Sequence, residues 1–253
     1  MDSSVRQRSI LRLLDDNGRV RVSELSQDLG VSEATVRRDL GQLQEQGWLK
    51  RTHGGAVLIK RAAPEPPVVQ RKEENAAQKQ RIGRAAAALI HEDDTVFIGS
   101  GTTALEVARH LRGRERITVI TNALTVINAL AWEEGITLLS TGGILRLSEQ
   151  SFIGHITEQA LQELCPHKTI MGIRAINLTS GLTNDYVPEV STDRVIIRSA
   201  PEVILVADHS KFGNVSTALV APVTAVHKIV TDSGTPPEMV RELEDLGIEV
   251  IVV

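Results

Sequence analysis

The sequence predicts an α/β protein of two domains, of which the larger, C-terminal one contains a mostly parallel sheet. Its 253 residues, 42% of them hydrophobic, suffice for one or two domains with cores of their own. Pro64, Pro66 and Pro67 fall in a segment without apolar periodicity. Helical patterns precede it, whereas short apolar runs alternating with helices follow it. We therefore expect domains over residues 1–60 and 76–253, with residues 61–75 as an extended linker; the alternative is a long surface loop within one domain.

The composition excludes several classes of protein. Aromatic residues make up only 2%, too few for a platform that stacks single-stranded nucleic acid. The single Cys165 excludes an internal disulfide framework and a multi-cysteine zinc site, and we expect it to be a buried thiol. No run of ~18 apolar residues is present, and the first ten residues lack the apolar core of a signal peptide. We expect a soluble cytoplasmic protein without a membrane partner, cofactor or metal site.

The charge is distributed unevenly between the two predicted domains. Residues 1–60 hold ten basic and eight acidic residues, whereas the remainder holds 18 and 24. The acidic C-terminal part is therefore a poor nucleic-acid surface, and any DNA-binding role belongs to the N-terminal part.

Three helices and a hairpin are expected in the N-terminal domain. Residues 10–14 give the first helix an apolar face, and Ser23 and Ser32 are N-cap residues for the second and third helices. The third helix ends near Gly47, and residues 48–59 predict a β-hairpin wing. The inward positions of the third helix are Val36, Leu40 and Leu43.

This order of helices and wing predicts a winged helix-turn-helix whose third helix enters the major groove of duplex DNA. Arg37 and Arg38, near the start of the third helix, can pair with guanine edges or phosphates. The alternative is a plain three-helix unit with a solvated arginine pair. The residues expected to contact DNA are Ser32, Thr35, Arg37, Arg38, Lys50, Arg51 and His53.

Short apolar runs and helices alternate in the C-terminal domain, which predicts a mostly parallel sheet covered on both faces. The predicted strands are residues 95–98, 117–120, 136–139, 168–172, 202–207 and 248–253. The predicted helices are residues 82–90, 102–111, 123–132, 195–199 and 238–246.

A phosphate cradle is predicted where the first of these strands runs into a helix. Residues 99–103, Gly-Ser-Gly-Thr-Thr, offer backbone N–H groups, a helix N-terminus and hydroxyls to an anion, although a capped helix after a glycine turn is the bland alternative. Polar loops follow other parallel strands, whose carboxyl ends form ligand crevices in α/β sheets. The expected effector-binding residues are Ser100, Gly101, Thr102, Thr103, Asn122, Gly142, Gly143, Asp208 and Lys211.

Residues 6–57 resemble the N-terminal winged helix of the DeoR family of bacterial transcription regulators, most specifically in VSEATVRRDL and RTHGGA. The resemblance continues through most of the chain. It implies a repressor or activator that binds duplex operator DNA as a homo-oligomer, a dimer or tetramer. It also implies a C-terminal sensor domain that resembles ribose-5-phosphate isomerase and responds to a small phosphorylated metabolite.

The chain departs from the family pattern at three positions. Gly99 stands where the family usually has an acidic residue, and Asp193 where it usually has a lysine, with Arg194 beside it as a possible substitute. Arg174 lies where another acid is usual. We expect Asp193 to repel phosphate and the ligand to be smaller than, or hydroxylated differently from, a hexose phosphate.

Three functions remain open from the sequence. The first is a DNA-binding transcription regulator, in our interpretation a repressor, of carbohydrate or related metabolism under the control of a small effector. The second is a sugar-phosphate isomerase-like enzyme with an accessory domain, which needs a carboxylate base such as Glu189. The third is a regulator that senses no ligand. We expect no catalytic residues.

Overall fold

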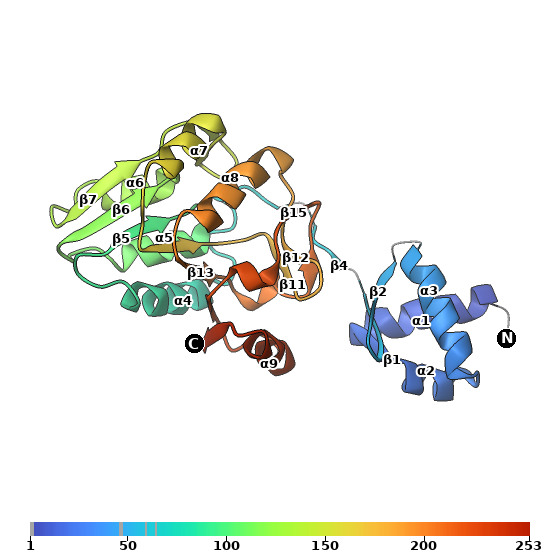
Figure 1. Ribbon diagram of the computed structural model, residues 1–253. Helices are drawn as coiled ribbons and strands as arrows, with labels where there is room; N and C mark the ends of the chain where they lie inside the picture. The colour runs from blue at the N-terminus through green and yellow to red at the C-terminus, as the bar shows by residue number, and fades with distance from the viewer. Residues whose placement is uncertain (1–2, 46–47, 59, 64) are drawn as a thin grey trace. The chain divides into compact units, whose positions relative to one another are not determined.

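The computed structural model describes residues 3–45, 48–58, 60–63 and 65–253. It divides into two compact units, Met1–Lys60 and Arg61–Val253, each with a hydrophobic core of its own (Figure 1). The expected helix end near Gly47 and the proline Pro64 lie outside the described residues.

Three helices and a small antiparallel sheet form the N-terminal unit. Its elements are α1 (Ser3–Asn17), β1 (Arg19–Arg21), α2 (Val22–Leu29), α3 (Glu33–Glu45), β2 (Leu49–Thr52) and β3 (Gly55–Leu58). The strands are ordered β1-β3-β2, so the predicted wing is present and gains a third strand that the sequence analysis did not identify.

Turn and cap residues explain why the second and third helices form where they do. Gly30 follows α2 with φ of +62°, a left-handed conformation that glycine adopts at little cost. The Ser32 hydroxyl then accepts a hydrogen bond from the Thr35 amide, at 3.2 Å, and caps α3 as predicted. The expected inward residues of α3 are fully buried together with Ile10, Leu14 and Leu49.

A buried ion pair fixes α1 against α3. Asp39 is 1% exposed in the middle of α3 and accepts hydrogen bonds from the guanidinium of Arg6 and from the Ser3 hydroxyl. A buried carboxylate needs such partners, and here both come from the first turns of α1. The pair therefore helps to set the orientation of α3.

A seven-stranded parallel sheet forms the centre of the C-terminal unit, with strand order β17-β16-β13-β10-β5-β6-β7 (Figure 1). The strands are β5 (Thr95–Ile98), β6 (Ile117–Thr121), β7 (Ile136–Ser140), β10 (Lys168–Met171), β13 (Glu202–Val206), β16 (Lys228–Thr231) and β17 (Glu249–Val252). The helices are α4 (Ala76–Ala88), α5 (Thr102–Arg109), α6 (Leu124–Leu130), α7 (His155–Gln162), α8 (Val187–Arg198) and α9 (Pro237–Asp245).

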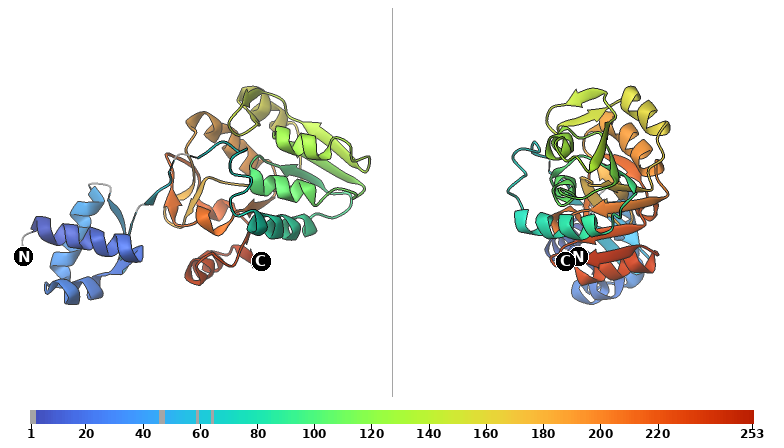
Figure 2. Two further views of the ribbon diagram at one scale, coloured as in Figure 1. Left: turned by 180° about the vertical axis from the view of Figure 1, so that it is seen from behind. Right: turned by 90° about the vertical axis from the view of Figure 1, so that its left-hand side faces the viewer.

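Alternate residues of each strand enter different cores on the two faces of this sheet. Val96 and Ile98 of β5 pack with α4, α5 and α6, whereas Phe97 between them packs on the other face with residues of α7, α8 and α9. This alternation is the period of two that an extended strand imposes. Figure 2 shows the helices covering both faces of the sheet, as predicted.

The remaining elements are short strands and two 3-10 turns. They are β4 (Lys60–Arg61), β8 (Ile144–Arg146), β9 (Ser151–Ile153), β11 (Ala175–Asn177), β12 (Gly181–Asn184), η1 (His209–Lys211), β14 (Asn214–Val215), β15 (Ala218–Ala221) and η2 (Val223–Ala225). They pair as β11-β12-β15, β14-β4 and β8-β9. None of these short elements is predicted by the sequence patterns.

The sequence-based expectations also missed β16 and α7 and began α4 and α8 too late, and they differ from the structure for the linker and for Cys165. Residues from Glu65 onward in the expected linker pack into the C-terminal unit, where Val68 is 1% and Arg71 is 6% exposed. Proline excluded regular secondary structure here, but it did not prevent burial. Cys165 is exposed, because α7 ends at Gln162 and the thiol falls in the loop before β10. No helix among the described residues is long and apolar enough to span a bilayer.

Candidate DNA-binding face and anion pocket

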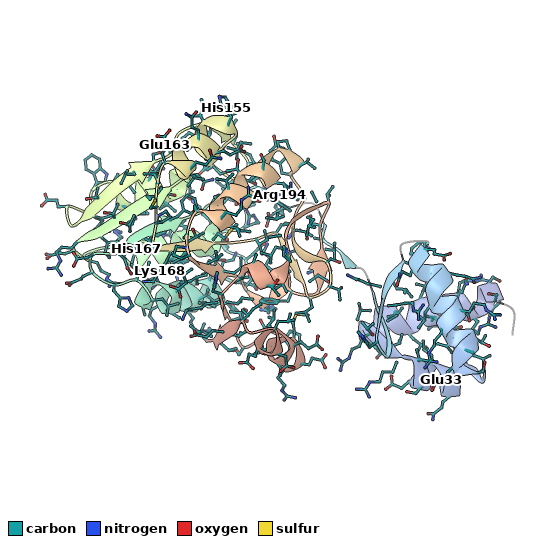
Figure 3. The ribbon with its side chains drawn as sticks, viewed as in Figure 1. Glu33, His155, Glu163, His167, Lys168 and Arg194 are labelled. Carbon is teal, nitrogen blue, oxygen red and sulfur yellow. The ribbon has the colours of Figure 1, made fainter. Side chains whose placement is uncertain are left out.

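The start of α3 carries the exposed polar side chains expected of a recognition helix. Ser32, Arg37 and Arg38 are exposed and Thr35 is half-buried. Arg37 donates to Glu33 one turn earlier, at 2.8 Å, and Figure 3 labels Glu33 at this end of the helix. No ion pair of Arg38 is present within the described part of the chain. Both guanidinium groups are therefore available to a partner, Arg38 without breaking any contact.

The wing adds a second basic surface. Arg51 and His53 are exposed, and Lys50 is half-buried on β2. The Arg51 amide donates to Gln44 of α3 at 3.0 Å, which ties the wing to the end of that helix. All seven residues predicted to contact DNA thus lie on α3, its cap or the hairpin of one small unit.

A pocket in the C-terminal unit lies beyond the carboxyl ends of three neighbouring strands, β5, β10 and β13. Its lining includes the residues that follow these strands, 100–104, 172–174 and 206–207. Side chains from β8, β12, α8, η1, the turn between β8 and β9, and residues 65–71 complete it. This is the position where open α/β sheets bind ligands. The volume of the pocket is about 60 Å³, room for several water molecules at ~10–15 Å³ each, and so for a small anionic group.

The N-terminus of α5 faces this pocket as the sequence predicts. Gly101 has φ of +104°, which a residue with a side chain rarely adopts, and it precedes Thr102 and Thr103 in the first turn. The first amides of a helix have no intrahelical acceptor, so these N–H groups and the helix dipole favour an anion. Ser100, Gly101, Thr102 and Thr103 all line the pocket.

Four cationic side chains line the same pocket, and carboxylates compensate each of them. Lys211 lies 2.8 Å from Glu65, and Arg71 contacts both Glu65 and Glu149. The other two cations are Arg146, which pairs with Glu189 and stacks on Tyr186, and Arg174, which pairs with Glu65.

Burial raises the pKa of two of the acids that line the pocket, Glu149 and Asp193. It raises the pKa of Glu149 to about 7, against the lowering effect of Arg71. Burial and the neighbouring Glu189 raise the pKa of Asp193 well above its usual range, while Asn184 donates a hydrogen bond of 2.7 Å to it. Both shifts favour the neutral form of these acids and so reduce the negative charge that opposes the four cations. The expected repulsion of phosphate by Asp193 is weakened in the same direction.

Four of the residues predicted to bind an effector are not among those that line the pocket. Asn122 and Asp208 are buried and hold loops, through a hydrogen bond to Phe152 for the first and to the amide of Ser210 for the second. Gly142 and Gly143 lie beside Thr157, whose hydroxyl donates to the Gly142 carbonyl. These residues follow parallel strands as predicted, but the hydrogen bonds of Asn122, Asp208 and Gly142 stabilise loops of the protein itself.

The departures from the family pattern also have different consequences from those expected. Gly99 does not line the pocket, since a Cβ there would contact Met171 instead. Arg194 does not replace a missing cation, because its guanidinium donates to the carbonyls of Leu219 and Val220 on β15 (Figure 3). Arg174 does line the pocket and supplies a cation there.

Several residues that line the pocket were not predicted as site residues from the sequence. Periodicity says nothing of them, because they lie in loops or at the ends of short strands. The sequence did contain charged residues that could have indicated them. RLSE, residues 146–149, has an arginine followed by an acid, and QRKEE, residues 70–74, is a charged run beside the prolines. These residues are Glu65, Arg71, Arg146, Glu149 and Asn184.

Comparisons with known proteins agree with the division of the chain into an N-terminal and a C-terminal unit. The DeoR-like helix-turn-helix domain model matches residues 6–62, and the DeoR C terminal sensor domain model matches residues 74–233. The transcriptional repressor AccR of Agrobacterium fabrum is 39% identical over 91% of this chain and 90% of its own. The glycerol-3-phosphate regulon repressor of Escherichia coli is 33% identical over 98% of both chains. Among solved structures, ribose 5-phosphate isomerase A of Methanocaldococcus jannaschii is 18% identical, covers 55% of each chain and has a TM-score of 0.41.

The fold and the two sites define a DNA-binding transcription regulator with a separate sensor domain. The chain belongs to the DeoR family.

Proposed function

We propose that this protein is a repressor that binds operator DNA through α3 and the wing and releases or tightens that binding when a small phosphorylated effector enters the pocket. The observation that carries the proposal is the convergence of the α5 N-terminus and four cations at the carboxyl ends of β5, β10 and β13. Oriented amides with nearby cations are the usual partners of a phosphate group.

The proposed DNA contacts are those of the two arginines of α3, with the wing along the phosphate backbone. The exposure of Arg37 and Arg38 supports these contacts. Both project from a helix whose opposite face packs into the core of the unit. We further propose that two or more copies of the chain act together, since paired heads gain effective concentration on a two-fold site. A cytoplasmic location follows from this role.

We also propose that the pocket has no isomerase activity. Glu189, the candidate base, is held by Arg146 and by the Ser151 hydroxyl at 2.8 Å. Both carboxylate oxygens of Glu189 are thus engaged within the fold, which favours a structural role over proton abstraction from a substrate carbon.

Calorimetry with a panel of phosphorylated compounds tests the effector. Glycerol 3-phosphate comes first because of the name of one relative, followed by small phosphorylated acids and hexose phosphates. Thr102→Val and Lys211→Ala should weaken binding by tenfold or more, since each removes a polar group of the lining.

Two matched variants control for general damage. Thr125→Val alters a buried threonine in the first turn of α6, which does not line the pocket. Lys168→Ala removes a lysine from the start of β10, the opposite end of the same sheet (Figure 3). Both should bind like wild type. Tight binding that survives Thr102→Val and Lys211→Ala would place the effector elsewhere, and an effector that does not alter operator affinity would refute the regulatory role.

A further inference from the structure

We propose that Glu65 competes with the effector's anionic group for Arg71, Arg174 and Lys211, so that effector binding displaces Glu65 and frees the segment that joins the two units. The inference rests on the proposed function, because it assigns the regulation of the same pocket.

One carboxylate oxygen of Glu65 serves all three cations. Its Oε1 lies 2.8 Å from Nζ of Lys211, 3.0 Å from Nη1 of Arg71 and 3.8 Å from Nη1 of Arg174. All four side chains are nearly buried, with 7% to 16% of each exposed. A ligand phosphate or carboxylate that reaches these cations therefore meets Glu65 at contact distance, where two like charges disfavour each other.

The backbone around Glu65 is attached to the same wall of the pocket. The Glu65 amide donates to Asp185 at 3.0 Å, and Arg174 donates to the Ala63 carbonyl. Before them, the Ala62 amide donates to the Val215 carbonyl at 2.9 Å, close in sequence to Lys211. The contacts of the carboxylate and of the backbone thus share Arg174, so that loss of the first weakens the second.

The cluster also has binding capacity that Glu65 does not use. Within the described part of the chain, Nε of Arg174 and Oδ1 of Asp185 are buried without a hydrogen-bond partner, although Nε lies 3.8 Å from Oδ2 of Asp185 in an ion pair. Buried polar groups normally have a hydrogen-bond partner, so an acceptor that reached this guanidinium nitrogen would add a hydrogen bond that the ion pair does not supply.

Two of the four lining acids, Glu189 and Asp193, lie on α8, whereas Glu65 and Glu149 lie in segments without helix or strand. Of these two, Glu65 lies a few residues after the boundary of the two units. Displacement of Glu65 requires no helix to unfold. The displacement releases the segment that joins the DNA-binding unit to the sensor unit. A ligand that binds the released state more tightly than the closed one raises the population of the released state by the ratio of these two affinities.

Titration of the full-length protein with inorganic phosphate tests the competition. Glu65→Gln removes the competing charge with little change in shape, and phosphate should bind about tenfold more tightly than to wild type. Glu73→Gln removes an exposed acid from the same segment, and phosphate should bind as in wild type. Glu65→Ala repeats the test if the glutamine itself retains contacts, and the double variant Glu65→Gln/Lys211→Ala should lose the gain. Equal phosphate affinity of wild type and Glu65→Gln, or no binding by either, would overturn the proposal.

Hydrogen exchange gives a second readout that does not depend on affinity. Phosphate should accelerate exchange of the Ala62 and Glu65 amides in wild type, and in Glu65→Gln their exchange should be fast without it. Unchanged or slower exchange on adding phosphate would overturn the proposal. If phosphorylated effectors bind, depend on Lys211 and change operator affinity while Glu65→Gln behaves as wild type, the proposed function stands and this inference alone fails.

Discussion

Arg37 and Arg38 occupy adjacent exposed positions on α3, yet their surroundings differ. Arg37 is already engaged by Glu33, in an exposed pair of the kind that contributes only about 0.3–0.5 kcal/mol to stability. Arg38 has no such partner among the described residues. Neither arginine is therefore needed for the fold, which makes both suitable for testing DNA contacts.

Replacing either arginine by alanine should weaken binding to a selected operator by about 1–3 kcal/mol. A base-reading arginine relaxes specificity at one base pair, whereas a phosphate contact weakens all sequences and flattens the salt slope by about one. Gel-shift titration at several salt concentrations distinguishes the two roles. The control is Arg109→Ala, which removes an exposed arginine that pairs with Glu106 on α5 of the C-terminal unit. Wild-type affinity in both α3 variants would refute the assignment.

The raised pKa of Glu149 predicts a pH dependence with a definite sign. Its ordinary value is 4.5 and its folded value is about 7, so between these the folded state binds more protons than the unfolded state. Stability contributed by this group is therefore present below about pH 4.5 and is lost as the pH rises through 7.

Glu149→Gln should remove that pH dependence. Wild type should lose stability relative to the variant between pH 5 and 7, by at most about 1.4 kcal/mol per pH unit. Denaturant unfolding at a series of pH values measures the difference. A difference that is constant over this range, or that grows in favour of wild type, would contradict the assigned pKa.

At the scale of elements, two helical glycines look alike in sequence but face different neighbours. Gly83 of α4 packs against α5 so closely that a Cβ would lie 2.5 Å from Cβ and 2.7 Å from the carbonyl carbon of Glu106. At Gly41 of α3 the nearest atom is the end of the Arg51 side chain, 3.9 Å away.

Gly83→Ala should destabilise the C-terminal unit by about 1–3 kcal/mol, although alanine is the better helix former, because backbone of α5 must move. Gly41→Ala should stabilise the N-terminal unit by roughly 0.5–1 kcal/mol through its helix propensity alone. Thermal unfolding of both variants checks this opposition of sign. Stabilisation by Gly83→Ala would show that α4 and α5 pack less closely than described.

At the scale of the whole molecule, residues 65–75 belong to the sensor unit rather than to a free linker. Val68 and Arg71 are buried there, and Arg71 is the cationic partner of Glu149. A sensor fragment that begins near Asn75, the boundary that the sequence indicates, would leave that carboxylate without its guanidinium. Removing one partner of a buried pair costs about 3–5 kcal/mol.

A fragment of residues 61–253 should therefore melt roughly 10 °C above a fragment of residues 76–253. Calorimetry of the two fragments measures this, and the C-terminal transition of the full chain serves as the reference for the longer one. Equal melting temperatures would mean that residues 61–75 contribute little to the sensor unit. The N-terminal unit alone should bind an operator half-site weakly, because it lacks a linked second head.

Local patterns determined a large part of this protein. Apolar spacing located α2 and α3, and Ser32 caps α3 as predicted, whereas Ser23, the predicted cap of α2, lies inside that helix after the N-cap Arg21. Alternating apolar runs located six of the seven parallel strands and missed β16. The cradle of residues 100–103 followed from strand, glycine and helix in succession. Each of these is a short-range property, decided by backbone sterics, capping hydrogen bonds and the period of a helix or strand.

Only the tertiary structure decided which distant charges meet. Glu65 and Lys211 are 146 residues apart and Arg71 and Glu149 are 78 apart, and no periodicity links residues across such separations. The same holds for Asp193, which the sequence presents as an ordinary carboxylate and whose pKa is raised by burial and by the neighbouring Glu189. Burial and long-range pairing set the charge of this pocket, because the cost of desolvating an ion depends on what surrounds it in space and not on its neighbours in the chain.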